Sequence, residues 1–308
     1  MKVAIITDSA NTGYYLKKLQ AFAQGITNDE VVQRKSYQPI DYDAAVIFGS
    51  YKIHRKRPQH RGKGVIINSG IPYVQLETQL IGRSITTHEH DEFRVGVNGF
   101  LWDDADWGFD YVDPTRYQKV FERNKYDVNQ KWKDTGDHIV LCMQKVGDAS
   151  LRGLDIFDWT RDTIKELRQH TDRKIIVRPH PLYRKKLNHK ALEEECAELK
   201  DVIWKGTNLN TGEYEPIQND IAKAWCTVTY TSGTGIDAVL SGTPNIACNS
   251  GSMVYEVSSK KLSEVENPYR GDRTAWMKKI AMCQWNTEEF ENGECWKHIR
   301  KAINETSK

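Results

Sequence analysis

The stretch Thr229-Tyr-Thr-Ser-Gly-Thr-Gly-Ile-Asp-Ala-Val-Leu-Ser-Gly-Thr-Pro244 is the most informative part of this chain. It is typical of a strand that ends near residue 231, a turn of small residues, a short helix at 236–240 and a second strand from 245. A small-residue turn that opens a helix points backbone N–H groups at one spot, with the positive end of the helix dipole behind them. Such a turn is a ready anion site, and a diphosphate is its usual ligand.

A second motif, Arg178-Pro-His-Pro181, follows a predicted strand at residues 174–177 in the same half of the chain. If the two strands belong to one parallel sheet, both motifs lie at its carboxyl edge, where open α/β sheets bind ligands. The alternative is that each motif is an ordinary strand-to-helix loop. The occurrence of both in this order favours a ligand site.

The length of 308 residues predicts two domains of ordinary size. Residues 1–7 are too short for a signal peptide or a membrane span and match a buried first strand, so we expect no membrane association. The six cysteines lack the spacing of a metal site, and most lie in apolar segments. We expect them to be reduced core residues of a cytoplasmic protein.

Strands alternate with helices in both halves, which predicts an α/β fold with a parallel sheet in each. Predicted strands of the first half are residues 2–7, 31–33, 44–48, 65–67 and 72–76. In the second half, strands at 139–143, 174–177 and 201–204 alternate with helices at 157–170, 188–199 and 217–225. Further helices are expected at 273–283 and 288–303, although Gly293 is unfavourable inside the last one.

Two segments of the first half interrupt this alternation. Residues 86–114 are rich in aromatic residues, Gly and Asp, and a loop of this length is more often functional than idle. Residues 117–137 are polar and charged, and we place the domain boundary there. The predicted domains are residues 1–135 and residues 136–308, the second of them ending in the terminal helix.

Two Rossmann-like domains that face a central cleft, with the phosphate-binding turn in the second, are the layout of a GT-B glycosyltransferase. The two motifs quoted above resemble the donor half of capsular-polysaccharide-type glycosyltransferases. Gly147-Asp-Ala-Ser-Leu-Arg-Gly153 and Cys283-Gln-Trp-Asn-Thr-Glu-Glu-Phe-Glu-Asn-Gly-Glu-Cys-Trp296 resemble segments of glycosyltransferases encoded by bacteriophages. The resemblance covers about residues 139–300 and is thin in the first half. No G-x-G-x-x-G fingerprint follows a strand, which disfavours a dehydrogenase.

This resemblance implies a nucleotide diphosphate sugar as the donor, bound between the domains. Ser232, Gly233 and Thr234 would contact the diphosphate, while Arg178 and His180 would offset the charge on the leaving phosphate. The other donor-side residues that it implies are Gln144, Lys145, Asp148, Arg152, Thr231 and Asp237. Asp237 is equally well explained by the helix dipole, and His180 by a structural role in its own loop.

A hydroxyl acceptor needs a general base, which this layout takes from the first half. Our choice is Glu77, a carboxylate just after a predicted strand, with an exposed salt-bridging role as the alternative. Other candidates are Asp8, Asp103, Asp104 and Asp106. His54, His60, His88 and His90 lie in one region, but their spacing is a weak metal signal. We expect no metal and no cofactor besides the nucleotide sugar.

The segment from Lys52 to Lys63 contains six Lys or Arg, two His and no acid, and is predicted to be a loop. It is either a solvated charged loop or a grip for a polyanion such as DNA. The candidate DNA contacts are Arg55, Lys56, Arg57, Arg61 and Lys63. Phe100, Trp102, Trp107, Phe109 and Tyr111 could stack on a sugar or a flipped base, although core packing is the simpler role for most of them.

The sequence therefore predicts a metal-independent GT-B-like glycosyltransferase, located in the host cytoplasm if it is phage-encoded. Its expected acceptor is a 5-hydroxymethylpyrimidine base in phage DNA. Three alternatives stay open: a polysaccharide or lipid-linked glycan acceptor, a nucleotide-sugar epimerase, and a binding protein without catalysis. The nucleotide, the sugar, the stereochemical outcome and the oligomeric state do not follow from the sequence.

Overall fold

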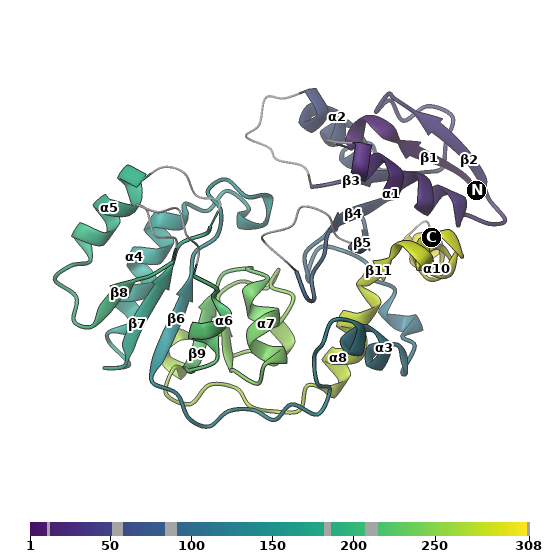
Figure 1. Ribbon diagram of the computed structural model, residues 1–308. Helices are drawn as coiled ribbons and strands as arrows, with labels where there is room; N and C mark the ends of the chain where they lie inside the picture. Colours follow the sequence, from purple (N-terminus) through teal and green to yellow (C-terminus); the bar gives the residue numbers. More distant parts are fainter. Residues whose placement is uncertain (11–12, 51–57, 84–90, 182–185, 207–214, 307–308) are drawn as a thin grey trace. The chain divides into compact units, whose positions relative to one another are not determined.

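The structure, a computed structural model, describes residues 1–10, 13–50, 58–83, 91–181, 186–206 and 215–306 (Figure 1). The chain forms two compact α/β units, each with a Rossmann-type sheet, as predicted. Unit 1 comprises Met1–Asn124 and Met277–Lys308, and unit 2 comprises Lys125–Trp276. The division at Asn124 differs from the expected boundary near residue 135. The C-terminal segment also belongs to unit 1, whereas we had assigned it to the second domain.

Unit 1 is built on a six-stranded sheet with the order β11-β5-β4-β3-β1-β2. Its strands are β1 Lys2–Ile6, β2 Glu30–Arg34, β3 Ala44–Phe48, β4 Tyr73–Thr78, β5 Glu92–Val97 and β11 Gln284–Asn286. The first four are mutually parallel, and β5 is antiparallel to both β4 and β11. Alternate residues of β1 point to opposite faces of the sheet. Val3 and Ile5 pack in the hydrophobic cluster on one face, and Ala4 and Ile6 pack in a second cluster on the other face. A sheet covered on both faces accounts for the continuous apolar runs in these strands.

The helices of unit 1 are α1 Gly13–Gln24, α2 Pro58–Ile67, α3 Arg116–Arg123, α9 Thr287–Glu291 and α10 Glu294–Thr306. The strand predicted at residues 65–67 is wrong, because these residues end helix α2. In that helix Ile66 is buried while Val65 is 43% exposed. A three-residue apolar run fits one turn of helix as well as a strand, so its pattern could not separate the two.

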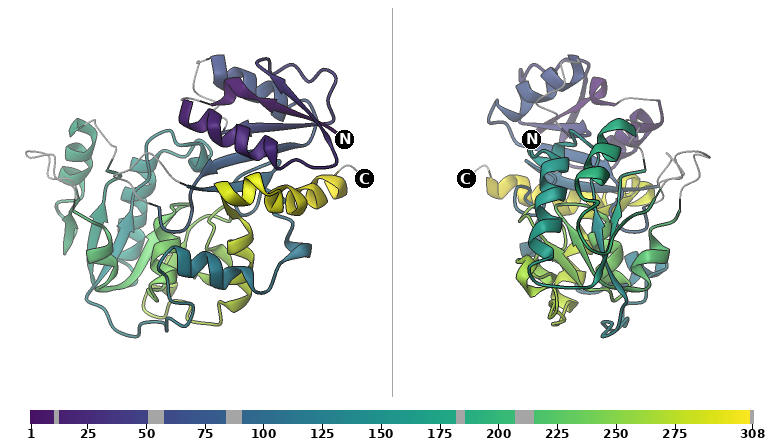
Figure 2. Two further views of the ribbon diagram at one scale, coloured as in Figure 1. Left: turned by 45° about the vertical axis from the view of Figure 1, so that its right-hand side comes forward. Right: turned by 90° about the vertical axis from the view of Figure 1, so that its left-hand side faces the viewer.

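The expected loop at 86–114 contains a strand, β5, which pairs with both β4 and β11. The final helix predicted at 288–303 is in fact two helices, α9 and α10, that part at Gly293. This glycine has φ +83°, and an added Cβ would lie 2.7 Å from the carbonyl oxygen of Gly25. Only glycine combines a left-handed backbone with so close an approach. Both chain ends lie on unit 1, with α10 as its last helix (Figure 2).

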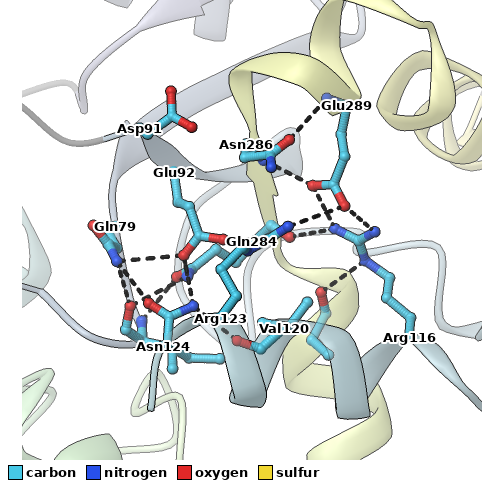
Figure 3. Close-up of polar contacts among 12 residues, drawn as sticks. Gln79, Asp91, Glu92, Arg116, Val120, Arg123, Asn124, Gln284, Asn286 and Glu289 are labelled. Carbon is cyan, nitrogen blue, oxygen red and sulfur yellow. Dashed lines mark hydrogen bonds and ion pairs between the residues drawn. The ribbon is translucent and has the colours of Figure 1, made fainter.

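A network of polar side chains fastens the C-terminal segment to unit 1 (Figure 3). Arg116 of α3 forms a two-pronged ion pair with Glu289 of α9, at 2.6 and 2.9 Å, and lies over the ring of Trp285. Glu92 of β5 pairs with Arg123 and accepts a 2.7 Å hydrogen bond from Asn124. Burial raises the pKa of Glu92, and these partners oppose that shift. The bonds tie β5 and α3 to residues that lie far away in the sequence, which makes the C-terminal segment an integral part of unit 1.

Unit 2 contains a five-stranded parallel sheet with the order β10-β9-β6-β7-β8. Its strands are β6 His138–Cys142, β7 Lys174–Arg178, β8 Val202–Trp204, β9 Ala224–Thr229 and β10 Asn245–Ala247. Its helices are α4 Ile156–Leu167, α5 Lys186–Glu195, α6 Gln218–Ile221 and α7 Thr234–Leu240, while α8 Thr274–Met282 passes into unit 1. The helix predicted at 217–225 is shorter than expected, because Ala224 already begins β9. The remaining predicted elements of this half are confirmed to within a few residues.

Candidate functional site

The sheet of unit 2 reverses its strand order between β6 and β9. From β6 the chain adds β7 and β8 on one side, and then places β9 and β10 on the other. The segments that follow β6 and β9 therefore leave neighbouring strand ends in different directions. This switch point at the carboxyl edge is where open α/β sheets bind ligands. The segment after β6 carries Gln144, and the segment after β9 carries Thr231.

Gln144 joins these two segments. Its side chain is 7% exposed, and Oε1 accepts a 2.8 Å hydrogen bond from the N–H of Thr231. Its Nε2 lies 2.9 Å from the hydroxyl oxygens of both Thr231 and Ser150, and donates to them. The hydroxyl of Thr231 in turn lies 3.1 Å from the carbonyl oxygen of Ser150. Gln144 and Thr231 thus bond to each other and to Ser150.

Three other predicted donor-side residues share the segment after β6. Asp148 Oδ1 accepts hydrogen bonds from the N–H and the hydroxyl of Ser150, at 3.1 and 2.9 Å, and so caps a short 3₁₀ turn at Ala149–Leu151. The carbonyl of Lys145 accepts from Asp148 N–H at 3.0 Å. Arg152 is exposed and has the left-handed φ of +51°. The structure therefore brings Lys145, Asp148 and Arg152 onto one compact turn beside Gln144.

Ser232 and Gly233 lead into helix α7, which begins at Thr234, two residues earlier than predicted. Ser232 Oγ accepts the N–H of Thr234 at 3.3 Å and lies 3.1 Å from the Thr234 hydroxyl. Gly233 is exposed at this turn, and a Cβ added to it would meet no atom within 4 Å. The turn thus keeps its Ser/Thr hydroxyls together around one small, open position.

Asp237, in the first turn of α7, has a partner within unit 2. Its Oδ1 accepts a 2.8 Å hydrogen bond from the hydroxyl of Tyr126. Burial raises the pKa of this Tyr, and the neighbouring carboxylate raises it further. The bond anchors the start of unit 2 to α7, a role that sequence reasoning did not foresee.

Arg178, at the end of β7, is only 2% exposed. Its guanidinium forms an ion pair with Asp220, and Lys205 Nζ lies 2.8 Å from the other oxygen of the same carboxylate. Asp220 was missed, because it is 42 residues from Arg178 and lies in a segment that reads as an ordinary helix. His180 follows in the same segment and is partly buried. Arg178 is therefore a buried cation held in place by a carboxylate, and its role at the leaving phosphate stays a prediction.

The carboxyl edge of unit 1 contains the predicted base. Glu77, the penultimate residue of β4, accepts a hydrogen bond from the N–H of Ser50 and another, at 3.2 Å, from the N–H of its neighbour Thr78. Ser50 follows β3, so Glu77 links two adjacent strand ends. Burial raises the pKa of Tyr15, and the charge of Glu77 raises it further. Glu77 is partly exposed, and its role as the general base stays a prediction.

The alternative acids are mostly engaged in turns. Asp104 Oδ1 accepts the N–H groups of Phe100 and Leu101, and Asp106 Oδ1 accepts that of Gly108. Asp8 is exposed after β1. Among the predicted stacking aromatics, Trp107 is 2% exposed and belongs to the core. Trp102 and Phe109 pack together with ring centroids 5.1 Å apart, and Tyr111 lies under Lys301.

The basic segment is described only in part. Arg55, Lys56 and Arg57 lie outside the described residues, as do His54, His88 and His90. Arg61 is exposed on α2, in a helix where we expected a loop. Lys63 is 2% exposed, and its Nζ lies against Gly49, where an added Cβ would be 3.0 Å away. Its burial differs from the surface contact that we had expected of it.

All six cysteines are free, and five are buried. Burial raises the pKa of the Cys142 and Cys226 thiols to about 12, in keeping with reduced core residues. Within the described residues, no three His, Cys, Asp or Glu side chains are grouped to hold a metal ion. No helix in the described part of the chain is long and apolar enough to cross a membrane.

Comparison with solved structures places the chain in a known fold. KpsC of Thermosulfurimonas dismutans, a β-Kdo 2,7 transferase, aligns with a TM-score of 0.54 at 15% identity, over 97% of this chain and 99% of that one. A UDP-GlcNAc 2-epimerase of Methanocaldococcus jannaschii, solved with UDP-GlcNAc and UDP, aligns over the whole of both chains at 12% identity, with a TM-score of 0.35. No family description and no curated protein matches the sequence. The likeness to KpsC, at 15% identity, shows the GT-B-like α/β fold that the sequence predicted.

Proposed function

We propose that the protein is a glycosyltransferase that moves a sugar from a nucleotide diphosphate sugar to a hydroxyl group. The observation that carries the proposal is the bond between Gln144 and Thr231, which joins two predicted donor segments at the switch point of unit 2. The fold shared with a β-Kdo transferase supports the reaction class by analogy. An epimerase is the second candidate, because the same architecture serves it.

The chemistry assigns a different task to each unit. In unit 2, the turn around Gly233 would bind the diphosphate, and Arg178 and His180 would offset the charge that develops on the leaving phosphate. In unit 1, Glu77 would accept the proton of the acceptor hydroxyl, since an alcohol is a poor nucleophile near neutral pH. Neither task calls for a metal ion or a further cofactor.

For the acceptor we propose a 5-hydroxymethylpyrimidine in DNA. This finer assignment rests on the sequence: the acid-free run from Lys52 to Lys63 and the resemblance to phage glycosyltransferases. Of that run, Arg61 is an exposed cation in the structure, while Lys63 is buried. A polyanion bound here would be held by its phosphates, and its affinity would fall with salt.

The test is a transfer assay with a panel of nucleotide sugars. Each donor is incubated with and without duplex DNA that contains 5-hydroxymethylcytosine or 5-hydroxymethyluracil. The DNA is then digested to nucleosides, and their masses are measured by mass spectrometry. A gain of one sugar on the modified base would establish both donor and acceptor. Donor turnover that ignores DNA would redirect the acceptor to glycans, or to epimerisation if a new sugar isomer forms alone. No turnover with any donor would contradict the enzyme proposal.

The role of Glu77 has its own test. Glu77→Gln keeps the shape and the hydrogen-bond acceptor for Ser50 but removes the base, so kcat should fall about 10²- to 10⁴-fold with donor affinity unchanged. Asp8→Asn is the matched control at another strand end of unit 1, and should retain most activity. Equal losses in both variants, or none in Glu77→Gln, would remove Glu77 from the mechanism.

A further inference from the structure

Gln144 follows the parallel strand β6 by two residues and lies at the carboxyl edge of the sheet, where open α/β sheets bind ligands. Here it is 7% exposed, and its amide is used inside the protein. Oε1 accepts from Thr231 N–H at 2.8 Å, and Nε2 lies 2.9 Å from the hydroxyls of Thr231 and Ser150. An amide offers two donor hydrogens and two acceptor lone pairs. Three of these four are therefore directed at protein partners, and the hydroxyl oxygen of Thr231 also lies 3.3 Å from Oε1.

The bonds of Gln144 continue on both sides. On one side, Ser150 is bonded to Asp148 Oδ1 through its N–H and its hydroxyl. On the other side, Thr231 leads directly into Ser232, whose hydroxyl accepts the N–H of Thr234. Hydrogen bonds therefore run from Asp148 through Ser150 and Gln144 to Thr231, and the peptide bond from Thr231 to Ser232 joins them to the turn that ends at Thr234. These bonds link the two segments that diverge at the switch point.

We propose that Gln144 is a positioning residue, which sets the spacing of the two donor segments but does not contact the donor. This deepens the proposed function and rests on it. A diphosphate has several oxygens that would contact groups from both segments at once. If the spacing of the segments is already fixed, binding does not have to bear the entropic cost of ordering the two segments. The amide is suited to this brace because it accepts a backbone N–H and donates to two hydroxyls from one planar group.

If Gln144 has this role, its substitution should weaken the binding of the diphosphate group and leave the binding of the nucleoside unchanged. We would measure the affinity for UDP, CDP, GDP, ADP and dTDP by calorimetry, and compare the tightest binder with its parent nucleoside. Gln144→Met keeps the side-chain volume and removes every bond of the amide. It should weaken the affinity for the nucleoside diphosphate about ten- to a hundredfold, because the two segments lose their fixed spacing and the charge-assisted hydrogen bonds that they would make to the phosphates weaken. The affinity for the nucleoside should stay within about twofold of wild type.

Gln284→Met is the matched control. Gln284 is also a buried amide, and its Oε1 accepts the N–H groups of Leu80 and Ile81 at 2.8 Å, but it lies in the polar network of unit 1 (Figure 3). This variant should lose comparable stability and keep wild-type affinity for the nucleoside diphosphate. If Gln144→Met does not fold, Thr231→Val carries the same test, because it removes only the hydroxyl between Gln144 and Ser150.

The outcomes separate the two proposals. Unchanged diphosphate affinity in Gln144→Met, or an equal loss in Gln284→Met, would overturn the positioning role and leave the proposed function standing. An equal loss for nucleoside and diphosphate would also overturn it, since the effect would not concern the phosphates. Wild-type protein that binds none of the five nucleotides would refute the proposed donor itself, and with it the role of Gln144.

Discussion

The ion pair of Arg178 and Asp220 offers a sharp test of how unit 2 is held together. The two side chains are 2% and 5% exposed, so each charge depends on the other for its stability. Asp220→Asn keeps the shape and removes the negative charge, which leaves the buried guanidinium with the more distant and exposed carboxylate of Glu215, 4.0 Å away. Loss of one partner of a buried pair costs about 3–5 kcal/mol. We expect a decrease of that size in the free energy of unfolding.

The measurement is urea unfolding, followed by tryptophan fluorescence and far-UV circular dichroism. Lys205→Met is the control, because Lys205 Nζ contacts the same carboxylate at 2.8 Å but its side chain is 38% exposed. Solvent screens such a pair, so this variant should lose only about 0–1 kcal/mol. A large loss in Asp220→Asn with a small one in Lys205→Met would show that burial, not contact with the carboxylate, determines the cost.

A double variant distinguishes a missing partner from a missing interaction. Arg178→Met combined with Asp220→Leu removes both buried charges and should recover most of the stability, because an apolar pair avoids the desolvation penalty. Stability of Asp220→Asn within about 1 kcal/mol of wild type would refute the reasoning, since it would mean that water reaches the guanidinium. If the double variant is no more stable than Asp220→Asn, the charge argument is also refuted, because the loss of stability would then come from packing.

Two further predictions concern the other unit and the pH. Burial lowers the pKa of His138 below its usual 6.5, so the unfolded state binds more protons than the native state, and stability should fall as the pH drops through about 6.5. His138→Gln should reduce the shift of the urea midpoint between about pH 7.5 and about pH 5.5, and an unchanged shift would exclude this histidine as a cause. In unit 1, Gly293 has a φ of +83°, and a Cβ added to it would lie only 2.7 Å from the carbonyl oxygen of Gly25. Gly70 has a similar φ of +77°, but a Cβ added there would meet no atom within 4 Å. We expect Gly70→Ala to cost about 1–2 kcal/mol and Gly293→Ala distinctly more by thermal unfolding, and equal costs would contradict the close-approach argument.

The sequence predicted those features that depend on neighbours in the chain. Continuous apolar runs such as Ala44–Phe48 indicated strands covered on both faces, and the small-residue turn after β9 indicated its place at the carboxyl edge. It missed what depends on distant partners. Strand β11 has three residues and forms because it pairs with β5, across more than half of the chain. The return of the C-terminal segment to unit 1 has the same origin, since Arg116 and Glu289 are 173 residues apart.

The site shows the same division at the level of single residues. Sequence reasoning located Gln144, Thr231, Arg178 and Asp237 at the correct strand and helix ends, because topology alone decides where those ends meet. It could not decide whether each side chain faces a ligand or another part of the protein, since that depends on burial. Gln144 and Arg178 are both below 10% exposure and are bonded within unit 2. Under the proposed function, the polar residues at this edge would be of two kinds: residues that touch the donor, and residues that hold the donor-binding groups in place. Substitution of the second kind should disturb donor binding through the geometry of the first, which is the distinction that the Gln144→Met experiment measures.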